Sequence, residues 1–253
     1  MISEVYSHLG QNNEGKDVKI SVVVPTYNEK ENLLQFVDEL KSTLGESIDY
    51  EIIVVDDNSP DGTGKVAEEL SRKNHFIKVI HRPEKMGLAS ALIDGFKECG
   101  GDFVLVSDAD LQHSPALIKT FLEEVNRGAD LVIASRYIAG AETNGWSPLR
   151  KIVSKCATAF AHIFLPKTRR INDPISGYFM LRKEMLLRNR LTGISWKLLL
   201  EILVNGGFQK VVEVPYVFRP RINGKSKLKL REFFDYLILI ALLRERIGKQ
   251  NIY

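Results

Sequence analysis

The stretch VKISVVVPTYNE at residues 18–29 decides the fold class of this chain. Residues 18–24 form a short β-branched run that ends at Pro25, which is typical of a strand buried inside a sheet. Asn28 with Glu31 three residues later predicts the cap of a following helix. Apolar residues then recur on one helical face, at Leu33, Leu34, Val37, Leu40 and Leu44. A buried strand that leads directly into an amphipathic helix indicates an α/β protein.

The alternation of strands and helices continues beyond this unit. Further strands are predicted at residues 51–55, 76–80, 103–106 and 131–134, and helices at 64–73, 88–99 and 117–125. Later in the chain we predict helices at 147–164 and 194–205 and an extended segment at 211–218, where Pro215 favours an edge position. This order predicts a doubly wound, mostly parallel sheet, and such sheets bind ligands outside the carboxyl ends of their strands.

Length and composition fit one domain of this kind. The chain has 253 residues, of which 44% are hydrophobic, so it can bury a core without metals or disulfides as supports. Its two cysteines, Cys99 and Cys156, argue against a disulfide framework and favour a reducing compartment. Residues 1–17 are polar, without a secretory signal, and are expected to form a flexible leader. The longest apolar stretch, 236–243, is far short of the roughly 20 residues of a membrane span.

The net charge of +3 hides an asymmetry along the chain. Residues 1–130 carry 13 Lys and Arg against 24 Asp and Glu, whereas residues 131–253 carry 22 against 8. One interpretation is chance clustering on solvated faces. The other is an acidic site that needs cations beside a basic site that needs anions.

Three predicted strands end in polar or acidic clusters, at residues 25–29, 56–63 and 107–113. Asp108 and Asp110 follow a buried strand, and two carboxylates brought together require a cation. Hard oxygen ligands suit Mg²⁺ or Mn²⁺, which commonly bridge protein carboxylates to substrate phosphates, and Gln112 adds a neutral oxygen. The alternative is that Asp108 caps the following helix and Asp110 is solvated.

The second cluster offers a nucleoside contact. Of Asp56 and Asp57, one is expected to accept hydrogen bonds from a base or ribose, while the other caps the turn. Tyr27 either stacks on a base or is simply packed. Gly62-x-Gly64-x-x-Ala67 matches a dinucleotide fingerprint, but its glycines lie too far from the strand end and acidic side chains precede them, so we reject it. A phosphate loop, zinc spacing and a Gly-x-Ser-x-Gly motif are also missing.

These clusters resemble the inverting family 2 glycosyltransferases, and more closely the dolichol-phosphate (polyprenol-phosphate) mannosyltransferases. The resemblance covers roughly residues 19–230, and further matching motifs are Gly87-Leu88, Ser135-Arg136-Tyr137, Arg150-Lys151-x-x-Ser154, Asp173-Pro174-x-Ser176-Gly177, Glu213-Val214-Pro215 and Gly224-x-Ser226-Lys227-Leu228. It implies a glycosyltransferase A-type fold. Two departures are Lys225 in place of the family's usual glutamate, and no C-terminal membrane helices of the kind that some members carry. The processive-synthase signature Gln-x-x-Arg-Trp is missing, which disfavours a polymerising enzyme.

The resemblance also implies roles for individual residues. It assigns the nucleoside to Pro25, Tyr27, Glu29, Val55 and Asp57, and the metal ion and diphosphate to Asp108, Ala109, Asp110 and Gln112. It assigns the phosphates of acceptor and donor to Arg136, Arg150, Ser154, Arg221 and Lys227. Asp108, Asp110, Arg136 and Arg221 are then the expected catalytic residues.

The implied reaction is inverting transfer of mannose from GDP-mannose to a polyprenol phosphate. Such a phosphate is already largely dianionic near neutral pH and needs no strong general base, so Glu201 is expected to be a buried structural partner. One alternative is the same chemistry with UDP-glucose or a UDP-amino sugar. A second is a noncatalytic subunit that binds a nucleotide sugar or a lipid phosphate. A sugar-nucleotide pyrophosphorylase is disfavoured because no Gly-rich, Arg-bearing loop follows the first strand.

The C-terminal part combines charge with apolar character. Six cations lie within residues 219–231, and the aromatic-rich apolar run 233–243 follows. The pattern fits either docking at a membrane surface or a closing helix packed on the sheet. We therefore expect a catalytic domain at 18–228, an interfacial helix at 229–253, and a peripheral location on the cytoplasmic face of a membrane. No nucleic-acid motif accompanies the basic patch, and a small membrane-anchoring partner subunit is left open.

Overall fold

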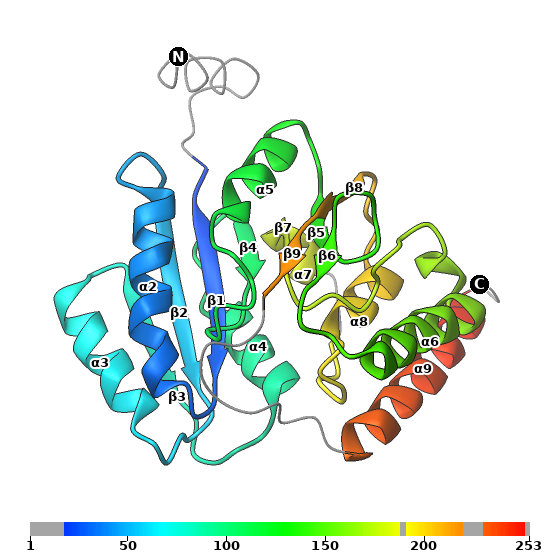
Figure 1. Ribbon diagram of the computed structural model, residues 1–253, viewed down its shortest axis with the longest axis horizontal. Coiled ribbons are helices and arrows are strands. Elements are labelled where there is room, and N and C mark those ends of the chain that lie inside the picture. The colour runs from blue at the N-terminus through cyan, green and yellow to red at the C-terminus, as the bar shows by residue number, and fades with distance from the viewer. Residues whose placement is uncertain (1–17, 188–190, 220–229, 251–253) are drawn as a thin grey trace.

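The computed structural model describes residues 18–187, 191–219 and 230–250. Within these ranges a seven-stranded sheet has the order β3-β2-β1-β4-β7-β5-β8 and carries helices on both faces (Figure 1). Its strands are β1 (Ile20–Thr26), β2 (Tyr50–Asp56), β3 (Ile77–His81), β4 (Phe103–Val106), β5 (Leu131–Ser135), β7 (Phe179–Arg182) and β8 (Val211–Pro215). All neighbours pair in parallel except β7, which is antiparallel to β4 and β5. The predicted doubly wound α/β fold is confirmed.

The helices and the smaller elements fill the connections between these strands. The helices are α2 (Lys30–Leu44), α3 (Thr63–Lys73), α4 (Leu88–Lys97), α5 (Leu117–Asn126), α6 (Pro148–Phe164), α7 (Lys183–Leu187), α8 (Leu198–Asn205) and α9 (Leu230–Gln250). A 3₁₀ turn covers Pro166–Thr168, and β6 (Glu142–Thr143) pairs with β9 (Val217–Phe218) in a separate two-stranded sheet. Pro215 ends β8 at the edge of the main sheet, as predicted.

Two core layers form because alternate residues of each strand point to opposite faces. Val22 and Val24 of β1 belong to a core cluster with residues of α2, α3 and α5, whereas Val23 belongs to a second cluster with residues of α4 and α8. Both faces are covered, which explains why the central strands are nearly continuous apolar runs rather than alternating ones.

The predicted cap of α2 at Asn28 is wrong. Asn28 has a left-handed backbone with φ of 55°, the N-cap position is Glu29, and no side chain of the segment itself caps the helix. The loop after β2 supplies acceptors instead, since the Glu29 amide donates to Thr63 Oγ1 (2.9 Å) and the Lys30 amide to Asp61 Oδ2 (3.2 Å). Residues distant in sequence thus accept hydrogen bonds from the backbone N–H groups at the start of α2.

Strand β7 and the start of α8 also differ from the predictions, whereas one predicted segment is not tested. The antiparallel strand β7 was not predicted, because four residues carry too weak a pattern. Helix α8 starts at Leu198, four residues later than the predicted 194–205. Residues 1–17, predicted as a flexible leader, lie outside the described residues.

The buried carboxylate of Glu51 links several segments at the amino end of the parallel strands, opposite to the strand-end clusters. Glu51 accepts hydrogen bonds from Ser21 Oγ (2.6 Å) and the Gly100 amide (2.5 Å), and it pairs with Lys78 Nζ (2.7 Å). Burial alone would raise the pKa of Glu51, but these hydrogen bonds and the Lys78 charge outweigh it and leave the pKa below its ordinary value.

We expect Glu51→Gln to lower the free energy of unfolding at pH 7 by about 1–3 kcal/mol, because the charge-assisted hydrogen bonds are lost. Because the pKa of Glu51 is lower in the folded state than in the unfolded state, the ionised carboxylate stabilises the fold at pH values above the unfolded-state pKa. This stabilisation is lost as the pH falls through the folded-state pKa. The difference between variant and parent in urea unfolding should therefore shrink below about pH 4. A difference that is equal at pH 7 and at low pH would contradict this, and Glu39→Gln on the outer face of α2 is the control.

Candidate active site

The strand-end clusters lie at the position where the strand order of the sheet reverses. The chain passes from β1 outward through β2 to β3 and then returns through α4 to β4, on the other side of β1. Such a switch point between adjacent parallel strands is where open α/β sheets bind ligands. Among the described residues, the non-glycine residues with positive φ are Asn28, Asn58 and Leu111, and all three lie just after β1, β2 or β4. Left-handed backbone at these positions is typical of functional loops.

The metal-binding candidates lie directly after β4. Asp110 is buried, and its Oδ1 accepts a hydrogen bond from the Gln112 amide at 3.1 Å. The Gln112 side-chain amide donates to the Arg219 carbonyl (3.1 Å), and the Arg219 amide donates to the Gln112 carbonyl (3.3 Å). Ala109 is buried in the core between the two aspartates. The loop is thus fixed both within itself and against the segment after β9.

The oxygen donors of this loop fit a divalent ion that is shared with a substrate. No group of three or more His, Cys, Asp or Glu side chains in the described ranges is arranged to hold a metal by itself. Two carboxylates, Asp108 and Asp110, are too few for a closed cage of protein ligands. They match the usual Mg²⁺ arrangement, in which one or two carboxylates bind the ion together with phosphate oxygens.

The nucleoside candidate Asp57 is engaged within the protein. Its carboxylate accepts hydrogen bonds from Arg82 Nη1 (2.7 Å), the Met86 amide (2.9 Å) and the Gly87 amide (2.9 Å). The buried Arg82 also donates to the Gly87 carbonyl and Ser90 Oγ and pairs with Asp94. Asp57 therefore organises the loop that leads into α4. Arg82 was missed in the sequence because no motif distinguishes it from a surface arginine.

Asp56 takes the other role foreseen for this pair of aspartates. Its carboxylate accepts hydrogen bonds from the Ser59 amide (3.1 Å) and Ser59 Oγ (2.5 Å), and so caps the turn after β2.

The other nucleoside candidates lie on both sides of this loop. Tyr27 is half-buried, and Lys85 Nζ lies 3.5 Å from the centroid of its ring. Glu29 accepts a hydrogen bond from Asn32 at 2.7 Å. Pro25 pairs with Val55 in the sheet register, and the Val55 side chain is fully buried in the core. Any contact of Val55 with a ligand is therefore restricted to its backbone.

A buried ion pair holds the first acceptor-phosphate candidate. The Arg136 guanidinium donates to Asp173 through Nε and Nη2, both at 2.7 Å, and the Arg136 amide donates to the same carboxylate at 3.0 Å. Burial would lower the pKa of Arg136, but the Asp173 carboxylate outweighs it and raises the pKa above its ordinary value. Asp173 is itself fixed, since its amide donates to Glu213 Oε1 at 2.9 Å.

The second and third acceptor-phosphate candidates, Arg150 and Ser154, lie on the first turns of α6. The Arg150 guanidinium lies 4.3 Å from the centroid of the Trp146 ring. Ser154, one turn further along α6, accepts a hydrogen bond from the Tyr137 hydroxyl at 2.6 Å. Arg136 lies 5.3 Å from the same Trp146 ring, so the structure brings both arginines together. Arg221 and Lys227 lie outside the described residues.

A buried lysine, Lys197, was not foreseen from the sequence. Lys197, just before α8, donates to the Ile175 carbonyl at 2.7 Å. Burial lowers its pKa well below the ordinary value; the charges of Arg136 and Arg150 lower it too, while those of Asp173 and Asp108 oppose the shift. A charged residue within an otherwise apolar segment is the signal that could have revealed it. The same segment contains Glu201, which is fully buried and accepts hydrogen bonds from Thr192, as a structural partner would.

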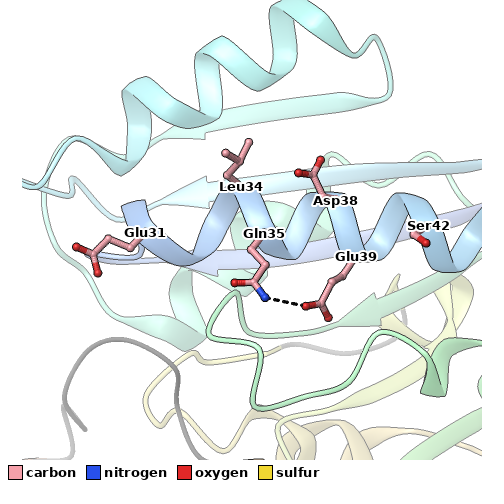
Figure 2. Close-up of a pocket in the computed structure, with 6 residues that line it drawn as sticks. All are labelled: Glu31, Leu34, Gln35, Asp38, Glu39 and Ser42. Atoms are coloured by element: carbon pink, nitrogen blue, oxygen red, sulfur yellow. Dashed lines mark hydrogen bonds between the residues drawn. The ribbon is translucent and has the colours of Figure 1, made fainter.

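A hollow elsewhere on the surface lacks this chemistry. It is lined by Glu31, Leu34, Gln35, Asp38, Glu39 and Ser42, all from the outer face of α2 (Figure 2). The hydrogen bond drawn inside it, from Gln35 Nε2 to Glu39 Oε1 at 3.0 Å, joins neighbours on one helix. No group of the strand-end loops lines this hollow, and we do not assign it to the site.

Comparisons with known proteins show what this chain is similar to. A dolichol-phosphate mannosyltransferase of Pyrococcus furiosus is 48% identical over 92% of this chain, which spans 65% of that protein. A polyprenol monophosphomannose synthase of Mycolicibacterium smegmatis is 36% identical over 87% of this chain and 84% of its own length. The crystal structure of glucosyl-3-phosphoglycerate synthase from Mycobacterium tuberculosis, with Mn²⁺, UDP and glucosyl-3-phosphoglycerate, superposes with a TM-score of 0.69 at 20% identity, covering 96% of this chain and 84% of that one.

The sequence model of glycosyl transferase family 2 matches residues 21–189, a range that contains the loops after β1, β2 and β4. This match covers more than half of the chain, and the mycobacterial relative is similar over most of its own length. The chain belongs to glycosyl transferase family 2.

Proposed function

We propose that this chain transfers mannose from GDP-mannose to a polyprenol (dolichol) phosphate with inversion, giving polyprenol-phosphate mannose and GDP. One observation carries the proposal: a carboxylate cluster and an arginine pair lie at the same side of the sheet. Strands β4 and β5 both run antiparallel to β7 and therefore point the same way, so Asp108, after β4, and Arg136, after β5, lie at the same edge of the sheet. The relatives named as mannosyltransferases with lipid phosphate acceptors support the choice of substrates.

The proposed chemistry requires two anions to meet. A lipid phosphate is largely dianionic near neutral pH, so its oxygen attacks the anomeric carbon without a strong base. Arg136 and Arg150 bind the phosphate, and a guanidinium suits this because its fork matches two phosphate oxygens. Direct displacement inverts the sugar. Positioning and electrostatic stabilisation then supply most of the catalysis.

Asp108, Asp110 and Gln112 are the proposed ligands of Mg²⁺ or Mn²⁺. When bound there, the ion neutralises charge on the diphosphate as it leaves. The chain's own contribution is a fixed loop, because the Asp110 carboxylate and the Gln112 side chain are both held by hydrogen bonds. Tyr27 and the neighbouring Lys85 are proposed to contact the nucleoside from the other side of the switch point.

An assay with purified protein tests the donor, the acceptor and the metal together. Labelled GDP-mannose and UDP-glucose are each incubated with a short polyprenyl phosphate and Mn²⁺ or Mg²⁺, and label is scored in the organic phase. We expect transfer from GDP-mannose and its loss when the metal is chelated. Transfer from UDP-glucose alone would favour the UDP-sugar alternative, and no transfer from either donor would favour the noncatalytic one.

We further propose a catalytic domain at 18–228 and an interfacial segment at 229–253 that lies on the cytoplasmic face of a membrane. One face of α9 packs Tyr236, Leu239 and Leu243 against α6 and α8, which lie beside it (Figure 1). Large apolar side chains on α6 and α9 remain exposed: Leu149, Ile152, Val153, Ile163, Phe233, Phe234 and Ile238. Such an apolar surface fits insertion into the headgroup region. Each helix in the described ranges is too short or too polar to cross a bilayer.

Replacing Phe233 and Phe234 by serine should weaken binding to lipid vesicles at least about tenfold, because burying a phenylalanine contributes roughly 1.5–3 kcal/mol. The two side chains are 55% and 61% exposed, so the folded protein should not be destabilised. Co-sedimentation with vesicles that contain anionic lipid measures the effect. Leu34→Ser, on the outer face of α2, is the matched control, and equal vesicle binding by both variants would refute the interfacial segment.

A further inference from the structure

Trp146 is the common contact of the two acceptor arginines. It lies in the turn between β6 and α6, and only 9% of its surface is exposed. The Arg150 guanidinium carbon lies 4.3 Å from the centroid of its ring, and that of Arg136 lies 5.3 Å away. Phe218 of β9 meets the indole edge-to-face at 5.2 Å and so fixes the ring from a third side.

The two arginines differ in what else holds them. Arg136 is bound by Asp173 in a bidentate ion pair. Arg150 starts an exposed helix, and the Trp146 and Phe218 rings, the latter at 5.5 Å, restrict its long side chain. Two guanidinium groups repel each other, and the electron-rich face of an indole offsets this repulsion. The rings therefore keep both charges close before a phosphate is present.

We propose that Trp146 is a positioning residue that holds Arg136 and Arg150 together to receive the acceptor phosphate. The inference rests on the proposed function, because it takes these arginines as the phosphate site. The inference adds a separate claim: the aromatic face of Trp146, and not only its apolar packing, holds the two guanidinium groups in place. Among the described residues the indole Nε1 has no hydrogen-bond partner, so a ring without N–H loses no bond to any of them.

Three variants separate these roles in steady-state assays with GDP-mannose and a short polyprenyl phosphate. Trp146→Met fills the space without an aromatic face, Trp146→Phe keeps a face without N–H, and Arg150→Gln removes one guanidinium. We expect the Met variant to raise the acceptor KM about tenfold and to leave the donor KM within about twofold. The acceptor KM and the donor KM of the Phe variant should both stay within about threefold of the parent values.

The outcomes that overturn the inference are distinct from those that overturn the function. If Arg150→Gln raises the acceptor KM and Trp146→Met does not, Trp146 has no positioning role. The same holds if Met and Phe raise both KM values equally, which indicates general damage. If Arg150→Gln leaves the acceptor KM unchanged, the phosphate site itself is wrongly assigned and the inference falls with it.

A binding measurement keeps the test valid if the Met variant does not fold. The chain has two tryptophans, so in a Trp196→Phe protein the emission comes from Trp146. Titration with the short polyprenyl phosphate should change this emission, with saturation near the acceptor KM. Emission that stays constant through saturating acceptor would overturn the inference, because the indole would not be next to the bound phosphate.

Discussion

Asp110→Asn is expected to lower the rate of mannosyl transfer by about a hundredfold to a thousandfold, a typical loss when one preorganised electrostatic contact to the transition state is removed. Asparagine keeps the shape of the side chain and an oxygen that can accept the hydrogen bond from the Gln112 amide. The substitution therefore removes a charge and leaves the loop intact. Without that charge, the divalent ion binds more weakly and the diphosphate leaves with less stabilisation.

Initial rates across a Mn²⁺ titration measure this effect. The rate of the variant should rise only at Mn²⁺ concentrations well above those that saturate the parent, while the thermal midpoint stays within a few degrees. Asp38→Asn, on the outer face of α2 (Figure 2), makes the same chemical change on another surface and should keep full activity. A fully active Asp110→Asn protein would refute a metal site at the end of β4.

Asp173→Asn is expected to lower the free energy of unfolding by about 3–5 kcal/mol, because removing one partner of a buried ion pair leaves the other charge without compensation. Asp173 is fully buried, and its carboxylate accepts the Arg136 amide and two guanidinium donors. The acceptor KM should rise as well, since Arg136 loses the contacts that orient it.

Urea unfolding and acceptor kinetics of the same preparation test both effects. Asp130→Asn is the matched control, because Asp130 also pairs with an arginine, Arg182 at 3.2 Å, but that arginine side chain is 33% exposed. A partly exposed pair is better solvated than a fully buried one, so the control should lose less stability and keep its acceptor KM. Equal losses in the two variants would show that burial does not set the strength of the Arg136 pair.

The sequence alone determined the fold class and the neighbourhood of the site. Short apolar runs such as 18–24 and 103–106 predict buried strands because both faces of the sheet are covered, and this pattern is local. The acidic and polar residues after those runs predicted where the loops gather, since the carboxyl ends of parallel strands share one edge. Asp108 and Asp110 could therefore be placed at the switch point without any knowledge of their contacts.

Only the tertiary structure decided which partners these side chains have. Asp57 and Arg82 meet across 25 residues, Arg136 and Asp173 across 37, and Lys197 reaches a carbonyl 22 residues earlier. The start of α2 was mispredicted for the same reason, because its acceptors, Asp61 and Thr63, lie in the next loop and at the start of α3. Local patterns record which face of an element is buried. Hydrogen bonds and ion pairs depend instead on the three-dimensional packing of loops, and no periodicity in the chain encodes it.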